Sequence, residues 1–384
     1  MKWQYKLEED RKVHNIVYLA IIVLLIISMF FSNYLSIFLR LKPDYEFSND
    51  TEIHFINVGQ GDAIAIKFAN NEVMLIDSGT ELYRDKLMNY LDKIVLEGKG
   101  TIDYLVLTHI DNDHSGNMVS LISNYNIKSL YRPKLNSTIE DSASNNSNET
   151  YDAIISLAKE KNINLFYNEV GRTLSVGLAM VTWLSPIGIS FDDNLDSNNY
   201  SPVIRLDYNG KSALFTGDID SDIEESLINT YDNGELDIDI LKVAHHGSNY
   251  STSNEFLMST TPEYACISVG ENTYGHPANK LLERILKYDE NFGTTLYDNL
   301  YITRSSGNVI MTMADTIEVS TITNIDDYNF VGYYVYALIA ILVVMIFIAR
   351  PYVFILIKNI RFIVQNKRFE KYIAKERELE ENQK

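Results

Sequence analysis

The fold is decided by the run Leu105-Val106-Leu107-Thr108-His109-Ile110-Asp111-Asn112-Asp113-His114-Ser115-Gly116. An apolar strand leads here directly into four side chains of metal-ligand type, which are His109, Asp111, Asp113 and His114. A loop that leaves a strand can turn closely spaced groups toward one point, and divalent metals accept imidazole and carboxylate ligands. The motif therefore predicts a metal site. The alternative is an Asp/Asn-rich turn whose histidines cap neighbouring helices.

Three further motifs place similar chemistry at or near strand ends. One strand ends in Gly217-Asp218, where a carboxylate is suited to bridging two cations. Another ends in His245-His246-Gly247-Ser248, and adjacent residues of a strand face opposite ways, so we expect His246 to turn to the metal and His245 to the substrate. The loop Tyr274-Gly275-His276-Pro277 offers His276 as an acid or a phosphate contact, although alone it is an ordinary turn.

Short apolar runs alternate with amphipathic stretches, which predicts an α/β domain in which helices cover sheets. Strands are expected at Ile53–Val58, Ala63–Phe68, Val73–Ile76, Tyr104–Thr108, Ala179–Leu184, Val203–Tyr208, Ser212–Thr216, Ile238–Val243 and Tyr264–Val269, and helices at Leu82–Leu96 and Leu281–Lys287. The polar stretch from Asn136 to Thr150 is expected to be a surface loop, with a lid as the alternative. The single cysteine, Cys266, is expected to be buried in a strand.

Two long apolar stretches flank this domain, and each approaches the roughly 20 residues that a spanning helix needs. The first lacks the small-x-small site of a cleaved signal peptide, so we expect an uncleaved anchor. Lysine and arginine residues before the first stretch and after the second predict a two-pass cell-membrane protein with both termini cytoplasmic and the central domain extracellular. The expected order is an N-terminus at 1–12, a transmembrane helix at 13–40, the central domain at 50–327, a second transmembrane helix at 331–357 and a tail at 358–384.

The central domain is strongly acidic. From Asp44 to Phe330 the sequence has 18 Lys and Arg residues against 44 Asp and Glu residues, a balance of −26. Such a surface repels polyanions at long range, and no basic patch is visible in the sequence.

The motifs together resemble the metallo-β-lactamase superfamily, and more closely the extracellular hydrolase domains of the ComEC family of DNA-uptake proteins. Four motifs carry that closer resemblance, which are Asn57-Val58-Gly59-Gln60-Gly61-Asp62-Ala63, Leu75-Ile76-Asp77-Ser78-Gly79, Leu241-Lys242-Val243-Ala244-His245-His246-Gly247-Ser248 and Tyr274-Gly275-His276-Pro277. The match runs from about Ile53 to Met313, covers the central domain only and implies an αββα sandwich, which the two expected transmembrane helices would flank. The sequence shows no counterpart of the family's many-helix channel or of its nucleic-acid-binding module, so we do not expect this chain to be a DNA-import channel.

The resemblance implies roles for individual residues. His109 and Asp111 would hold one metal, Asp113, His114 and His246 would hold the second, and Asp218 would bridge them. Asp77 would orient a ligand by hydrogen bonding, and Asp62 and Asn199 would support the site. Asp111 stands where most of the superfamily has a second histidine, a substitution that the ComEC branch shares.

The first metal site is expected to be the weaker of the two. No histidine lies between His114 and His245, so its third imidazole is missing, and Asn198, Asn199 or Ser201 occupy about the right place. More oxygen and less nitrogen shifts the preference from Zn²⁺ toward Mn²⁺. We therefore expect one or two divalent ions, Mn or Zn, and no organic cofactor.

The expected reaction is metal-assisted hydrolysis of a phosphodiester, with Asp113 essential and His245 or His276 protonating the leaving oxygen. Three interpretations stay open. The protein is a surface nuclease acting on DNA, an extracellular phosphodiesterase for a small or cell-wall ester, or a non-catalytic metal-binding domain tethered to the lipid bilayer. The sequence leaves the oligomeric state open.

Overall fold

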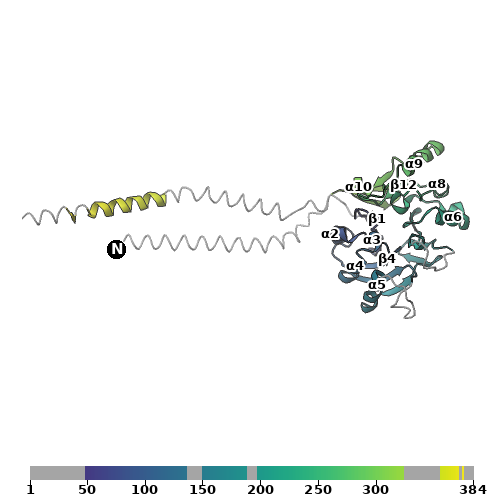
Figure 1. The fold of residues 1–384 in the computed structure, drawn as a ribbon, viewed down its shortest axis with the longest axis horizontal. Coiled ribbons are helices and arrows are strands. Elements are labelled where there is room, and N and C mark those ends of the chain that lie inside the picture. The colour runs from purple at the N-terminus through teal and green to yellow at the C-terminus, as the bar shows by residue number, and fades with distance from the viewer. Residues whose placement is uncertain (1–47, 136–148, 188–196, 324–354, 372–373, 376–384) are drawn as a thin grey trace, which may run out of the picture. The chain divides into compact units, whose positions relative to one another are not determined.

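The computed structural model describes residues 48–135, 149–187, 197–323, 355–371 and 374–375 (Figure 1). The chain divides into two units, Tyr45–Asp326 and the two flanking segments together. In the flanking unit a helix covers residues 355–371. No helix within the described ranges is both long and apolar enough to cross a membrane. The transmembrane prediction at 13–40, most of that at 331–357 and most of the predicted loop at 136–150 lie outside the described residues.

Two sheets form the centre of the unit Tyr45–Asp326. The first has the order β15-β14-β1-β2-β3-β4-β5-β6, formed by β1 Thr51–Phe55, β2 Ile64–Lys67, β3 Val73–Ile76, β4 Thr101–Val106, β5 Asn126–Arg132, β6 Asn164–Tyr167, β14 Asn308–Met313 and β15 Ile317–Ile322. The second has the order β13-β12-β11-β10-β9-β8-β7, formed by β7 Thr173–Val176, β8 Ala179–Trp183, β9 Ile204–Tyr208, β10 Lys211–Phe215, β11 Ile240–Lys242, β12 Tyr264–Ile267 and β13 Leu300–Ile302.

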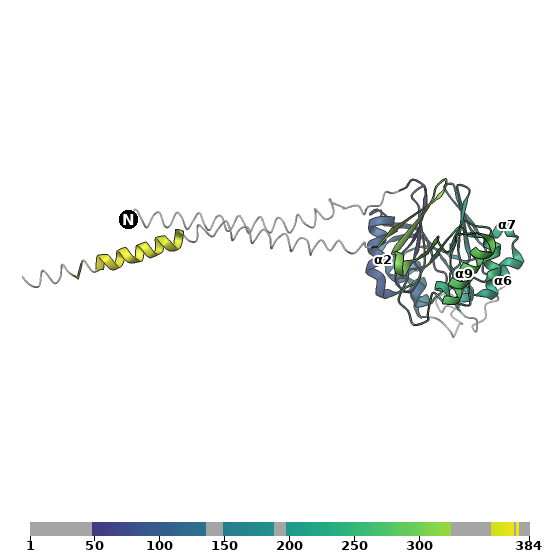
Figure 2. The same ribbon diagram turned by 90° about the horizontal axis from the view of Figure 1, so that it is seen from above.

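Helices cover the outer face of each sheet, as Figure 2 shows for α2 on one side and α6, α7 and α9 on the other. The first half of the domain contributes η1 Glu81–Tyr83, α2 Arg84–Tyr90, η2 Leu91–Val95, α3 Asn112–Ser115, α4 Met118–Asn124 and α5 Glu149–Glu160. The second half contributes η3 Ser197–Tyr200, α6 Ser221–Thr230, α7 Asn233–Leu236, η4 Ala244–Gly247, α8 Asn254–Thr260, α9 Asn279–Phe292 and α10 Thr303–Ser306.

Three apolar cores hold these four layers together. The middle core lies between the sheets, where Phe55 of β1 and Trp183 of β8 are fully buried. One outer core packs the helices near α2 onto the first sheet, and the other packs α6, α8 and α9 onto the second. The arrangement confirms the predicted αββα sandwich. It also confirms that Cys266 is a buried residue of β12.

Parallel pairing brings the motif-bearing loops to one edge of the sandwich. β3 and β4 run parallel in the first sheet, and β10 and β11 run parallel in the second. Their carboxyl ends therefore point the same way within each sheet, and the loops that follow them carry Asp77, His109, Asp218 and His246. Side chains far apart in the sequence meet there.

The loop that follows His246 is fixed by a buried carboxylate from α6. Glu224 is fully buried, and its two carboxylate oxygens accept hydrogen bonds from the backbone N–H groups of Thr252 and Ser253. On the other side, the guanidinium of Arg284 in α9 donates to the carbonyl oxygens of Ser251 and Thr252, each at 2.8 Å. Burial is the largest influence on Glu224 and raises its pKa from 4.5 to about 7, although the two N–H donors oppose that shift.

The raised pKa of Glu224 predicts a pH-dependent contribution to stability. This carboxyl ionises at its ordinary pKa of 4.5 in the unfolded chain and at about 7 in the folded chain. Its contribution to the free energy of unfolding is therefore fully present below pH 4.5 and is lost as the pH rises from 4.5 through 7. Relative to Glu224→Gln, the wild type should lose up to about 3 kcal/mol of unfolding free energy across this window. Urea denaturation at several pH values measures the difference, and parallel curves for the two proteins would contradict the prediction.

Candidate metal centre

Four side chains meet at the spacing of ligands around one small cation. The His246 Nε2 atom lies 3.3 Å from His114 Nε2, 3.1 Å from Asp218 Oδ2 and 3.3 Å from Asp113 Oδ2. His114 Nε2 lies 3.2 Å from Asp218 Oδ2. Ligand atoms about 2.0–2.1 Å from a tetrahedrally bound cation are separated by about 3.3–3.4 Å. His114, His246 and Asp218, whose atoms lie within 3.3 Å of one another, therefore have the spacing of ligands around one divalent ion, and Asp113 joins them beside His246.

The two imidazoles of this set are held so that their Nε2 atoms face the centre. His114 Nδ1 lies 2.7 Å from the Asp77 carboxylate, and His246 Nδ1 lies 2.7 Å from the carbonyl oxygen of Ser268. Each acceptor receives a hydrogen bond from the Nδ1–H group of its histidine. The Nε2 atom of the neutral ring therefore carries a lone pair. Two lone pairs 3.3 Å apart repel each other unless a proton or a cation lies between them.

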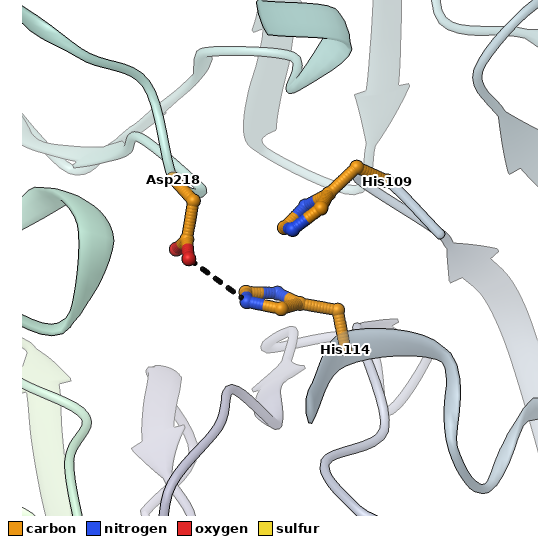
Figure 3. A group of neighbouring side chains, drawn as sticks. All are labelled: His109, His114 and Asp218. Carbon is orange, nitrogen blue, oxygen red and sulfur yellow. Dashed lines mark ion pairs between the residues drawn. The ribbon is translucent and has the colours of Figure 1, made fainter. Parts of the chain in front are cut away.

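His109 approaches the same centre from the loop after β4, and Figure 3 shows His109, His114 and Asp218 pointing toward one another. Asp77 reaches His109 through Thr108: the Thr108 hydroxyl donates to Asp77 at 2.7 Å, and His109 Nδ1 lies 3.0 Å from that hydroxyl. His109 Nε2 is buried and has no hydrogen-bond partner within the described residues. Such an orphaned buried nitrogen suits a metal ligand.

Asp111 does not join this cluster. Its side chain is 46% exposed, and the nearest approach to His109 Nε2 is 3.9 Å. Its other oxygen accepts a hydrogen bond from the Ser197 hydroxyl at 2.6 Å. Ser201 is the closer polar neighbour of His109, with its hydroxyl 3.4 Å from Nδ1. The Asn199 amide oxygen is buried without a hydrogen-bond partner among the described residues, but no described contact joins it to the cluster.

The two adjacent histidines lie on a left-handed turn, not on a strand as we expected. β11 ends at Lys242, and His245 and His246 have φ values of 50° and 52°, followed by Gly247 at 81°. Non-glycine residues in this region cost about 1–3 kcal/mol each and persist where surrounding contacts fix them. The turn sends the His246 ring to the cluster and leaves His245 30% exposed, with its Nε2 atom 3.9 Å from Asp218. His246 thus points to the cluster, as we expected, and His245 lies partly exposed beside it. The cause is the left-handed turn and not the alternation of side chains along a strand.

His276 lies at the outer side of the cluster. Its ring centroid is 5.6 Å from that of His245. Burial, and then the neighbouring His245 and His246, lower the pKa of His276. The structure therefore brings His276 beside His245.

A buried lysine is the part of the site that sequence analysis did not find. Lys242 is fully buried, and its ammonium lies 2.5 Å from Asp62 Oδ2 and 3.5 Å from Asp218 Oδ1. It also donates to the carbonyl oxygen of Gly217 at 2.8 Å. Lys242 therefore ties the loop before β2 to the loop after β10, and it leaves the other oxygen of Asp218 directed at His114 and His246.

The carboxylates dominate the electrostatics of the cluster. Burial opposes protonation of His246, but Asp218, Asp113 and Asp62 outweigh it and raise the pKa of His246 to about 10. Burial likewise opposes ionisation of Asp113, but His246 and His114 lower its pKa to about 2. A site that holds protons this strongly has an excess of negative charge, which a divalent cation neutralises by displacing those protons.

We predict that Lys242→Met lowers the free energy of unfolding by about 3–5 kcal/mol, because it leaves the buried Asp62 carboxylate without its cation. Adding Asp62→Asn removes that stranded charge, so the double variant should cost at least about 1 kcal/mol less than the sum of the single variants. Chemical denaturation measures the free energy of unfolding of each variant, and a chelator removes bound metal so that only the protein's own interactions contribute. Additive costs in this double-mutant cycle would show that the two groups do not stabilise each other.

Comparison with known proteins agrees with this geometry. A family model described as the metallo-β-lactamase superfamily matches residues 56–271. The chain is 30% identical over 273 residues to ComE operon protein 3 of Bacillus subtilis (strain 168), covering 65% of this chain and 33% of that protein. It is 29% identical over 251 residues to competence protein ComA of Neisseria gonorrhoeae, covering 65% of this chain and 31% of that protein.

Among solved structures, the metallo-β-lactamase fold protein YhfI from Bacillus subtilis aligns with a TM-score of 0.41 at 12% identity, covering 68% of this chain and 100% of that one. The chain spans about a third of the length of the two curated relatives. The family model covers more than half of the chain. The chain belongs to the metallo-β-lactamase superfamily, and its relatives there include proteins of the ComEC family.

Proposed function

We propose that the chain is a metal-dependent phosphodiesterase of the nuclease type, with its catalytic domain anchored at the outer side of the cell membrane. The single observation that carries the proposal is the cluster of the buried His114, His246 and Asp218 with the partly buried Asp113, in which each of the three measured partners of His246 Nε2 lies at the spacing of ligands around a divalent cation. Two of the curated relatives are named competence protein ComA and recombination protein 2, and competence and recombination are processes that involve DNA.

We propose one tight cation and a second, weaker one. The tight ion would be held by the four side chains above. His109 and Asp218 would hold a second ion. The third imidazole that the superfamily has at this position is missing here, and Asp111 accepts a hydrogen bond from Ser197 instead of joining the cluster. The extra oxygen ligands favour Mn²⁺ over Zn²⁺ at that position.

When bound, a divalent cation supplies positive charge that lowers the pKa of water and offsets the negative charge of the phosphoryl oxygens. The side chains of this chain supply the remaining functions. Asp77 fixes the ring of His114, and Lys242 fixes Asp218. His245 is the better-placed proton donor for the leaving oxygen, because it is partly exposed and lies beside Asp218. His276, whose pKa is lowered, is neutral near pH 7 and suits a hydrogen bond to the substrate.

The acidic surface favours a second candidate. A domain with a charge balance of −26 repels DNA but does not impede a small or cell-wall phosphodiester. The two candidates share the metal centre and the hydrolytic step, and they differ in the substrate that is cleaved.

The activity test uses bis(p-nitrophenyl) phosphate and single-stranded DNA with added Mn²⁺ or Zn²⁺. Asp113→Ala should lower kcat/KM for both substrates by more than about 100-fold, because even partners of metal ligands are worth about 10–100-fold. The matched control is Asp315→Ala, an exposed carboxylate in the turn between β14 and β15. Cleavage of the small diester alone favours the second candidate. If the folded protein binds metal but cleaves neither substrate, the phosphodiesterase proposal is wrong, and a tethered metal-binding domain is the better description.

The extracellular location has its own test. Cys266 is the single cysteine of the sequence and is buried, so Leu178→Cys, at an 87% exposed position between β7 and β8, introduces one accessible thiol. We expect a membrane-impermeant thiol reagent to label this variant on intact cells, with the unsubstituted chain as the control. Labelling only after lysis would place the domain inside the cell.

A further inference from the structure

A row of aromatic rings leads from the metal centre to the surface. His245 lies beside Asp218, the His276 ring centroid is 5.6 Å from that of His245, and the Tyr274 ring centroid is 5.9 Å from that of His276. Tyr274 ends the row with 75% of its surface exposed. Single exposed aromatic residues are common on proteins, so the position of Tyr274 beside the candidate site is the informative feature.

The loop that carries Tyr274 is tied to the site at several points. The Asn272 side chain donates to the carbonyl oxygens of Gly270 and His276 and accepts from the His276 N–H, at 2.8–3.0 Å. At its far end Ala278 N–H donates to Gly247, the residue after His246, at 2.8 Å. Gly270 packs so closely on Gly59 that an added Cβ would lie 2.3 Å from that backbone. A ring presented on such a loop is preorganised for a ligand.

The helix that follows this loop adds positive charge. α9 begins at Asn279, its first turn has no acidic residue, and Lys280 there is exposed. The amino end of a helix carries a partial positive charge that favours anions. An aromatic ring and a positive helix end next to a phosphodiesterase site together match a nucleotide, which has a flat base and a phosphate.

We infer that Tyr274 stacks on an unpaired base of the nucleotide next to the scissile phosphate, which makes single-stranded nucleic acid the substrate class. The inference rests on the proposed phosphodiesterase function. Stacking of a base on an aromatic side chain contributes about 1–3 kcal/mol and needs no basic surface. It therefore offers an acidic domain a way to hold a polyanion. Bases in a duplex are stacked on each other and unavailable to the ring, so duplex DNA binds more weakly.

The experiment measures binding to the full chain carrying Asp113→Ala, which prevents cleavage. Fluorescence anisotropy compares a labelled oligothymidylate with an abasic oligomer of the same length and phosphate number, at one salt concentration. With Tyr274 present, the oligothymidylate should bind about 5- to 150-fold more tightly, the range that corresponds to the stacking energy. Tyr274→Ala should reduce this ratio to near one, and Tyr274→Phe should retain it.

The matched control is Phe292→Ala, which removes a 54% exposed ring at the far end of α9, about 20 Å of helix away. It should leave the ratio unchanged. A ratio that survives Tyr274→Ala, or the absence of any base preference in the parent protein, overturns the inference. Cleavage by the protein with Asp113 intact is measured in parallel. Cleavage without base preference rejects the Tyr274 subsite alone, whereas base-dependent binding without cleavage rejects the phosphodiesterase function and retains the ring as a binding residue.

Discussion

The structure depends on holding several carboxylates at one buried point. Asp62, Asp77 and Asp218 are almost fully buried, and Asp113 is only 27% exposed, yet all four lie around the same two imidazoles. Like charges in a medium of low dielectric constant repel one another strongly, so such a cluster requires positive charge. Lys242 supplies one unit, and a divalent cation is the natural source of the rest. The sandwich supplies the frame, because loops from both sheets must meet for these groups to approach each other.

The sequence motifs predicted which side chains meet at the candidate metal centre because each motif is local. His109, Asp113 and His114 lie within six residues, and Asp218 and His246 each follow a strand directly, so strand ends in an α/β sandwich explain their meeting. The predicted positions of most strands of the two sheet centres were also right, as β3 and β9 show. The strands β5, β6, β7, β13, β14 and β15 were missed. β6 and β7 are four residues long with polar members, and so short a segment carries little periodicity.

Long-range features were not predictable in this way. Lys242 lies in an apolar strand, and only its distance to Asp62, 180 positions earlier, reveals its role. The left-handed turn at His245 and His246 was also missed, since consecutive non-glycine residues with positive φ are rare. Asp111 is a predicted ligand that the structure does not bring into the cluster. Its sequence spacing indicates a ligand, but the hydrogen bond from Ser197 holds it at the rim of the site.

The central claim is that His114, His246, Asp113 and Asp218 together bind one divalent cation more tightly than any other position of the domain. A crystal structure with Mn²⁺ or Zn²⁺, located by anomalous scattering at limiting metal, tests it most directly. The account predicts one strong peak bonded to the Nε2 atoms of His114 and His246 and to oxygens of the two carboxylates. A first ion bound instead by His109 and Asp111, with His246 outside its coordination, would contradict it.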